Sequence, residues 1–180
     1  MKQIRTDRLL LRAFTVDDLA DFYAYAKKPT VGPNAGWRPH RNHLETQAVL
    51  QDFIAKGEVW GIVYKVNNKL IGSIGFHEDK KRQNRQAKML GYVLDDDYWG
   101  QGLATEAAQA AVDFAFSELN LNLISAYHYP FNARSQRVIE KCGFQYEGCL
   151  RQATQLYDGN IYDDLCYSLS RQDYVALGNK

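Results

Sequence analysis

The sequence predicts a mixed α/β fold with one mostly antiparallel sheet of about seven strands and about four helices. One indication is that strand-like and helix-like segments alternate along the chain without an internal repeat or a low-complexity linker. A second is the succession of a strand, a helix and another strand near the middle, which predicts one parallel crossover. The chain has 180 residues, of which 46% are apolar and 24% charged. These values predict a single domain over residues 1–180 that is long enough to bury a core.

The first half of the chain is predicted to contain three strands and two helices. The strands cover residues 4–12, 59–66 and 70–76, and the helices cover residues 15–27 and 44–56. Thr15, followed by two aspartates, is typical of a helix start, and Pro29 ends that helix. Residues 29–42 carry three prolines and two glycines, which predicts a loop. Asn67 and Asn68 are expected to form a tight turn between two strands.

The second half is predicted to contain four strands and two helices. The strands cover residues 88–94, 123–129, 146–157 and 161–169, and the helices cover residues 103–116 and 133–142. Gly91 indicates a bulge where another segment or a ligand comes near. Gly143 stands where a left-handed cap of a helix belongs, and residues 158–160 are typical of a hairpin turn.

Charge and cysteine content argue against several classes of protein. There are 22 Lys and Arg against 21 Asp and Glu, and a net charge of +1 supplies no global field for binding nucleic acid or an anionic membrane. The charged N-terminal segment resembles neither a signal peptide nor a membrane span, so we expect a cytoplasmic location. The three cysteines have no metal-binding or disulfide spacing, and no metal site is expected.

Two glycines, Gly100 and Gly102, stand at the entrance of a predicted helix. A strand, a glycine turn and a helix place backbone amides at the positive end of the helix dipole, where a phosphate ester can bind. The alternative is that the glycines only relieve a crowded turn. A P-loop would need GK[ST] after its glycines, and a dinucleotide fold would need a glycine where Thr105 stands.

Three segments together resemble the GCN5-related N-acetyltransferases (GNAT), and within them the RimJ/RimL-like group: TDRLLLR, GYVLDDDYWGQGLATEA and NARSQRVIEKCGF. The resemblance covers nearly the whole chain. It implies a GNAT-type sheet with a central, splayed parallel pair of strands. It also implies an enzyme that transfers the acetyl group of acetyl-CoA directly to a primary amine, without a metal.

The resemblance further implies which residues bind coenzyme A. The pyrophosphate would lie on the glycine turn, the pantetheine arm along the preceding strand, and Asn132 would hydrogen-bond the same arm. Arg137, on a basic helix face, is expected to add a phosphate contact. The expected cofactor-binding residues are Tyr92, Val93, Leu94, Gly100, Gln101, Gly102, Leu103, Ala104, Thr105, Asn132 and Arg137.

Two positions depart from the pattern of the superfamily. Trp99 stands where many members have arginine or glutamine, which leaves backbone donors to bind the pyrophosphate. Ile139 stands where many members have the tyrosine that protonates the leaving thiolate. Ser135, one helical turn after Asn132, has the nearest hydroxyl, so Ser135 and Asn132 are the expected catalytic residues. The alternative is that Ser135 only completes the first helical turn.

The general base is left open. RimJ/RimL-like chains often carry an acidic residue where Met89 stands here. The remaining candidates are His77, Glu78, Glu106 and Asp163, or a water relay. Each residue also has a structural interpretation: Glu106 belongs to a solvent-exposed stripe, and Asp163 lies buried on an apolar strand face.

The acceptor is expected to be the α-amino group of a protein N-terminus, as for ribosomal proteins, or a small-molecule amine. Its pocket is predicted at Trp37 and His40 in one loop and at Tyr162 and Asp163 beside the last hairpin. A homodimer is left open. One alternative is a non-catalytic acyl-CoA sensor or assembly module, and another is a dinucleotide oxidoreductase.

Overall fold

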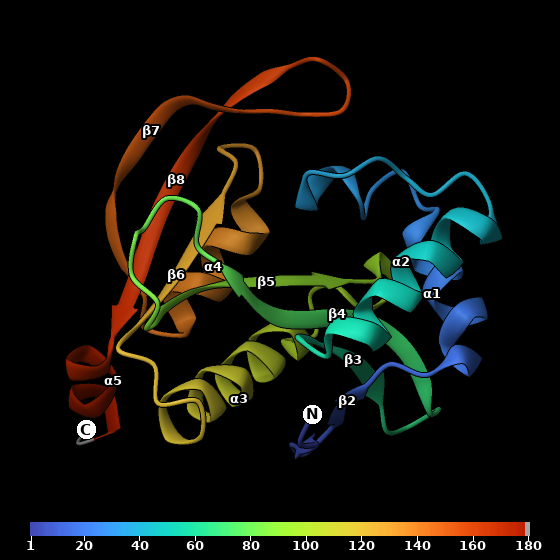
Figure 1. Cartoon of the computed structure of the whole chain (residues 1–180), viewed down its shortest axis with the longest axis horizontal. Helices are drawn as coiled ribbons and strands as arrows, with labels where there is room; N and C mark the ends of the chain where they lie inside the picture. The colour runs from blue at the N-terminus through green and yellow to red at the C-terminus, as the bar shows by residue number, and fades with distance from the viewer. Residues whose placement is uncertain (179–180) are drawn as a thin grey trace. The chain divides into compact units, whose positions relative to one another are not determined.

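The computed structural model describes residues 1–178. In this part of the chain eight strands form one sheet in the order β1-β2-β3-β4-β5-β6-β8-β7 (Figure 1). The strands are β1 (Ile4–Arg5), β2 (Leu9–Ala13), β3 (Val59–Tyr64), β4 (Lys69–Glu78), β5 (Ala87–Leu94), β6 (Leu123–His128), β7 (Gln145–Gln155) and β8 (Ile161–Ser170). The α-helices are α1 (Leu19–Ala26), α2 (His43–Lys56), α3 (Leu103–Ser117), α4 (Ala133–Lys141) and α5 (Arg171–Gly178).

The pair β5 and β6 is parallel in an otherwise mostly antiparallel sheet. Its register runs from Ala87 opposite Leu123 to Met89 opposite Ser125. Beyond Met89, β5 continues to Leu94 without a further partner from β6 in this register. The predicted fold class is therefore confirmed, including a central parallel pair that is only briefly hydrogen-bonded.

The described residues contain one strand and one α-helix more than the sequence predicted. Residues 4–12 are not one strand, because Thr6 N–H donates to Leu9 O at 3.0 Å and makes a turn between β1 and β2. The additional helix α5 begins with a reciprocal cap, in which Asp173 N–H donates to Ser170 Oγ and Ser170 N–H donates to Asp173. Local polar contacts of this kind do not change the hydrophobic periodicity, so they escape a pattern-based prediction.

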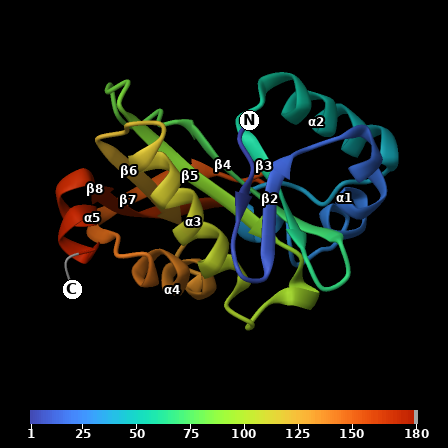
Figure 2. The same ribbon diagram turned by 90° about the horizontal axis from the view of Figure 1, so that it is seen from below.

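The first of two compact units comprises residues 1–75 and 92–110. Its core is aromatic: ring centroids of Phe14, Phe22, Tyr25 and Phe53 lie 5.3–5.8 Å apart. Helices α1 and α2 lie side by side (Figure 1), and β2 runs antiparallel beside β3 (Figure 2). This packing holds the loop between α1 and α2 and the turn after β5 within one unit.

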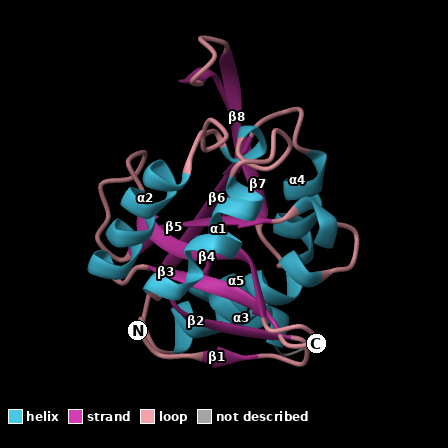
Figure 3. Cartoon of the chain, turned by 90° about the vertical axis from the view of Figure 1, so that its right-hand side faces the viewer, coloured by secondary structure: helices cyan, strands magenta, loops and turns pink. Residues whose placement is uncertain are grey.

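The second unit comprises residues 76–91 and the chain from residue 111 onward. In it β8 lies between β6 and β7 and is antiparallel to both. Strands β7 and β8 form a long hairpin that extends from this unit (Figure 3). The predicted turns are confirmed, with φ of +86° at Gly159 in the hairpin and +85° at Gly143 after α4.

Two expectations concern the chain as a whole. Among the described residues no helix is both long and apolar enough to cross a lipid bilayer. Contacts within the chain separate it into two compact units. The single domain over residues 1–180 stays a prediction.

Candidate functional site

The glycine turn lies between β5 and α3. Gly100 and Gly102 have φ of +76° and +77°, a left-handed backbone that residues with a Cβ rarely adopt. A Cβ at Gly100 would meet no described atom within 4 Å, and a Cβ at Gly102 would meet Arg8 Nη2 at 3.6 Å. The space at Gly100 is therefore open, and the space at Gly102 is bordered by the guanidinium of Arg8. The first amides of α3, which have no acceptor inside the helix, begin here.

Some other glycines of the chain differ from the turn, because neighbouring atoms leave no room there for a Cβ. A Cβ at Gly72 would lie 2.3 Å from Val93 O. A Cβ at Gly91 would lie 3.0 Å from the ring of His77. The close approach expected at Gly91 is therefore made by a side chain of the same unit, whereas nothing described fills the space at Gly100.

Trp99 connects the glycine turn to the end of β5. Its indole Nε1–H donates to Leu94 O at 2.8 Å. Its ring packs against the hydrophobic core of the first unit. The tryptophan thus combines a hydrogen bond with packing, which accounts physically for its place where many superfamily members have arginine or glutamine.

Glu106, in the first turn of α3, is not on a solvent-exposed stripe. Its carboxylate accepts from Thr6 Oγ at 2.5 Å, from Arg8 N–H at 2.9 Å and from Arg8 Nε–H at 2.7 Å. Burial raises the pKa of Glu106, but the hydrogen bonds from Thr6 and Arg8 outweigh it and the net pKa is lowered. These contacts give Glu106 a structural role, since a carboxylate held by three donors is a weak proton acceptor, and its role as general base stays a prediction.

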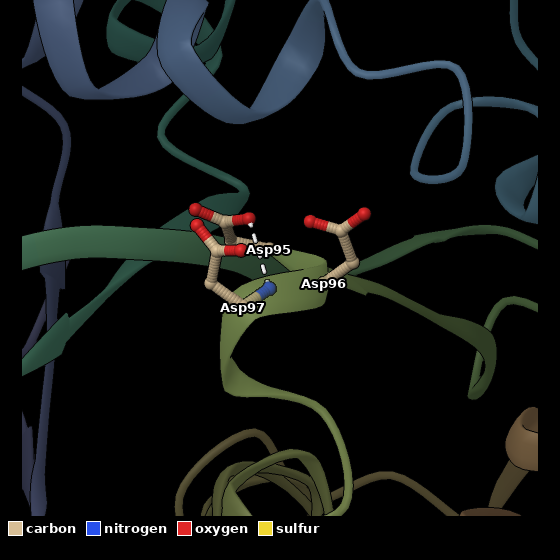
Figure 4. Close-up of side chains that lie close together, drawn as sticks. All are labelled: Asp95, Asp96 and Asp97. Carbon is tan, nitrogen blue, oxygen red and sulfur yellow. Dashed lines mark hydrogen bonds between the residues drawn. The ribbon is translucent and has the colours of Figure 1, made fainter.

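Three consecutive aspartates, Asp95, Asp96 and Asp97, precede the glycine turn and turn their carboxylates to one side of the chain (Figure 4). Their oxygens lie within 4.8 Å of one another, a spacing that could hold a metal ion. The Lys28 ammonium donates to all three, at 2.5, 2.7 and 2.8 Å, and stands where such a cation would be. Burial lowers the pKa of Lys28, but these carboxylates outweigh it and raise the pKa. This Lys28 clamp ties the end of α1 to the segment before the turn.

We expect Lys28→Met to lower the free energy of unfolding by about 2 kcal/mol, because three carboxylates would lose their common counter-charge in a partly buried position. Burial raises the pKa of Asp96, but the hydrogen bonds from Lys28 and Thr30 outweigh it and lower the pKa. The stability that Lys28 supplies through Asp96 is therefore present above the ordinary aspartate pKa of 3.8 and is lost as the pH falls below it, so the effect of Lys28→Met should shrink there. Urea unfolding at neutral pH and below pH 3.8 measures both effects.

Lys56→Met is the matched control for the clamp. The Lys56 and Asp52 side chains are 60% and 50% exposed, so breaking their solvent-screened ion pair should change stability far less than Lys28→Met does. Equal losses in the two variants would show that the Lys28 clamp is no stronger than a surface pair.

Trp37 and His40, predicted to line the acceptor pocket, pack inside the first unit. Their ring centroids lie 5.1 Å apart. His40 Nδ1 lies 2.9 Å from Thr46 Oγ, and His40 N–H donates to Ala26 O at 2.9 Å. Burial lowers the pKa of His40, against the opposing charge of Glu45. The loop is thus anchored to α1 and α2, and its role in acceptor binding stays a prediction.

The lowered pKa of His40 predicts how stability depends on pH. The unfolded chain, with a histidine pKa of 6.5, binds a proton more readily than the folded one. The contribution of a neutral His40 is therefore complete above pH 6.5 and is lost as the pH falls below it. We expect His40→Gln to lose less stability than the wild type on going from neutral pH to pH 5. Urea unfolding across this range measures it, and identical slopes would contradict the prediction.

The second unit carries Asn132, Ser135 and Arg137 at the start of α4. Asn132 is the N-cap: its Oδ1 accepts from Ser135 N–H at 3.1 Å. Arg137 is exposed. Ile139 is 1% exposed and faces the core, so it contributes packing. The predicted roles of Asn132, Ser135 and Arg137 stay predictions.

Asp163 is not the buried carboxylate of β8 that strand alternation predicts. It is partly exposed and accepts from Gln152 N–H at 2.8 Å, whereas Asp164 is 4% exposed. Asp164 accepts from Lys81 Nζ at 2.7 Å and from Thr154 Oγ at 2.9 Å. These hydrogen bonds offset the free-energy cost of burying its carboxylate. The register between β7 and β8 shifts around Gln152, and such an irregularity cannot be read from alternation alone.

Tyr162 belongs to an aromatic group of the second unit. Its ring centroid lies 5.0 Å from that of Phe131 and 6.0 Å from that of Tyr129. Phe131 is 48% exposed. An exposed aromatic wall of this kind suits the predicted acceptor pocket, although its contribution to acceptor binding stays a prediction.

Sequence reasoning missed Asp79, a carboxylate that is 3% exposed. It accepts from Ser125 Oγ at 2.6 Å, from Tyr127 OH at 2.7 Å and from Lys81 N–H at 2.9 Å. Burial raises the pKa of Asp79, but these hydrogen bonds outweigh it and lower the pKa. Burial likewise raises the pKa of Tyr127 to about 12. The only sequence signal is an acidic pair, Glu78 and Asp79, at the end of a strand.

Comparison with known families matches residues 8–145 to the acetyltransferase (GNAT) domain. The chain is 33% identical to the uncharacterized N-acetyltransferase YoaA of Bacillus subtilis (strain 168), over 92% of this chain and 95% of that protein. It is 27% identical to the ribosomal protein uS5-alanine N-acetyltransferase of Escherichia coli (strain K12), over 96% of this chain and 93% of that protein.

Solved structures share the fold. The GNAT-family acetyltransferase of Bacillus anthracis superimposes with a TM-score of 0.84 at 24% identity, covering 95% of this chain and 99% of that one. The microcin C7 self-immunity acetyltransferase MccE, solved with acetyl-CoA and AMP, superimposes with a TM-score of 0.77 at 20% identity, covering 92% and 93%. At these identities the likeness shows the fold alone.

Proposed function

Because the chain belongs to the acetyltransferase (GNAT) family of acyltransferases, we propose that it transfers the acetyl group of acetyl-CoA to a primary amine. The observation that carries the proposal is the turn at Gly100 and Gly102, with its left-handed backbone and open front. Backbone amides at a helix N-terminus donate to phosphate oxygens, and open glycines let these oxygens approach closely.

In this proposal the pyrophosphate lies on residues 100–105 and the pantetheine arm lies along Tyr92, Val93 and Leu94. The brief pairing of β5 with β6, which ends at Met89, supports the second part. Asn132 and Arg137 are proposed as further contacts on the strength of the resemblance. No step of the proposed reaction needs a metal.

The proposed reaction forms a bond between the amine nitrogen and the acetyl carbonyl carbon and breaks the carbon–sulfur bond. The products are an amide and the thiol of coenzyme A. The nitrogen gives up a proton to water, the departing thiolate takes one from the Ser135 hydroxyl, and water returns a proton to Ser135, with Asn132 helping to position the arm. Most of the rate enhancement would come from holding the two reactants in line.

We propose the α-amino group of a protein N-terminus as the acceptor, and we keep Trp37, His40, Tyr162 and Asp163 as its proposed contacts on the strength of the sequence alone. Support comes from the relative that is named for the alanine of ribosomal protein uS5. The aromatic residues at these positions suit an apolar first side chain of the acceptor more than a polyamine, which would prefer a continuous acidic surface. A small-molecule amine is the other outcome that the test must allow.

The test is acceptor-dependent release of thiol from acetyl-CoA. The panel should contain N-terminal peptides of ribosomal proteins, the same peptides with a blocked α-amine, and small amines, with products identified by intact mass. We expect release with free peptides and none with blocked ones. Coenzyme A binding without turnover on any acceptor would instead favour a sensor. Preferential thermal stabilisation by NAD would favour a dinucleotide enzyme.

A further inference from the structure

The guanidinium of Arg8 reaches the glycine turn from the segment between β1 and β2. Its Nη1–H donates to Gln101 O at 2.9 Å, and its Nε–H donates to Glu106 at 2.7 Å. Its Nη2 lies 3.6 Å from the position that a Cβ of Gly102 would occupy. A cation from a distant part of the sequence therefore stands beside the turn, where the sequence predicted backbone donors with Arg137 as a further phosphate contact.

Contacts within the protein hold Arg8 in this position. Glu106 receives both the backbone N–H and the Nε–H of Arg8, and Thr6 Oγ–H donates to the same carboxylate. The side chain of Arg8 is nevertheless 43% exposed. A side chain that is already fixed loses little conformational entropy when a ligand binds, so its remaining donors are preorganised.

The side-chain hydrogen bonds that Arg8 makes to other described residues use Nε and Nη1. Nη2 carries two further N–H groups next to the open side of Gly102. A guanidinium matches the geometry of phosphate oxygens, and the adjacent helix amides attract the same kind of anion. Glu106 offsets part of the Arg8 charge, so directed hydrogen bonds rather than long-range attraction should supply most of the effect.

We infer that Arg8 is a phosphate-binding residue of the co-substrate site, which positions the glycine turn through Gln101 and donates from Nη2 to a pyrophosphate oxygen. The inference rests on the proposed function, since it takes a coenzyme A thioester as the ligand. It adds to the turn a side chain that lies 93 positions away from Gln101 in the sequence.

The test compares three ligands: coenzyme A, dephospho-coenzyme A, which keeps the pyrophosphate but lacks the 3′-phosphate, and pantetheine, which lacks the pyrophosphate and the whole nucleotide part. Arg8→Met should raise the dissociation constants of the first two by about 10-fold and leave that of pantetheine within about twofold. Arg8→Lys keeps the charge but cannot contact Gln101, Glu106 and a phosphate together, so it should fall between wild type and Arg8→Met.

Arg12→Met is the matched control. Arg12 lies in the same unit and pairs with Asp18 through two hydrogen bonds of 2.7 Å. Its loss should lower the melting temperature without changing the affinity for dephospho-coenzyme A. Glu106→Gln tests whether Arg8 acts only by supporting Glu106. This variant retains the Arg8 guanidinium, so it should weaken coenzyme A binding less than Arg8→Met does.

Calorimetry on folded variants decides between the outcomes. Unchanged affinity for coenzyme A in Arg8→Met, or equal weakening for pantetheine, would overturn the role of Arg8. If Glu106→Gln and Arg8→Met weaken coenzyme A binding equally, Arg8 only supports Glu106. This result would also overturn the phosphate-binding role of Arg8. If the wild type itself binds no coenzyme A, the proposed function fails, and this result is distinct from the others.

Discussion

A Gly102→Val protein should fold and bind coenzyme A at least about 100-fold more weakly than the wild type, because its side chain would fill the space that a phosphate needs. In the structure that space is bordered by Arg8 Nη2, 3.6 Å from the position of the new Cβ. The φ of +77° would also be strained for a β-branched residue. Isothermal calorimetry with coenzyme A measures the loss.

Gly57→Val separates this loss of space from backbone strain. Gly57 caps α2 in the same unit with φ of +61°, and a Cβ there would also meet no described atom within 4 Å. Both variants should therefore lose about 1–3 kcal/mol of stability. Gly57→Val should keep its affinity for coenzyme A. A folded Gly102→Val protein with normal affinity would mean that the phosphate binds elsewhere.

Replacing Ser135 with alanine should reduce turnover by about 100-fold and leave coenzyme A affinity nearly unchanged, as expected for loss of a proton donor. The cap of α4 should survive, because Asn132 Oδ1 accepts from the backbone N–H of Ser135, which alanine retains. Stability should consequently fall by no more than about 1 kcal/mol. Steady-state kinetics combined with calorimetry and thermal unfolding measures all three quantities.

Two further variants sharpen the interpretation of Ser135→Ala. Ser135→Thr keeps a hydroxyl and should recover much of the rate. Ser117→Ala removes a helical serine whose Oγ–H donates to Asp113 O at 2.7 Å, and it should not affect turnover. Restoring a tyrosine at Ile139 is a poor rescue, because this position is 1% exposed and would be overpacked. Full activity of Ser135→Ala would assign the proton to water.

Features that depend on neighbouring residues were predicted well from the sequence. The turn between β3 and β4 forms at Asn67 and Asn68, with φ of +56° at Asn68. The glycine after α4 adopts the expected left-handed cap. Turn-forming residues and hydrophobic periodicity act over a few neighbouring positions. They can therefore be recognised in a single sequence.

Charged partners were predicted poorly. Glu106 looked like a member of a solvent-exposed stripe, but its partner Arg8 lies 98 positions earlier. Asp79 gave only the weak signal of an acidic pair with Glu78, although Tyr127, 48 positions later, donates to it. Lys28 meets Asp95 across 67 positions. An isolated Lys or Asp in a sequence predicts an exposed side chain. Burial of such a charge becomes favourable only when a partner, which can be distant in the sequence, compensates for the lost hydration.

The sequence by itself determined most of the helices and strands, the resemblance to an acetyltransferase family and the glycine turn at Gly100 and Gly102, because each of these is written in contiguous residues. Only the tertiary structure decided which titratable groups are already engaged: Glu106 holds Arg8, Lys28 holds the aspartates before the turn, and Asp164 rather than Asp163 is buried. The physical reason is that hydrogen bonding and desolvation depend on distances in space, which folding sets among residues that are remote in the chain.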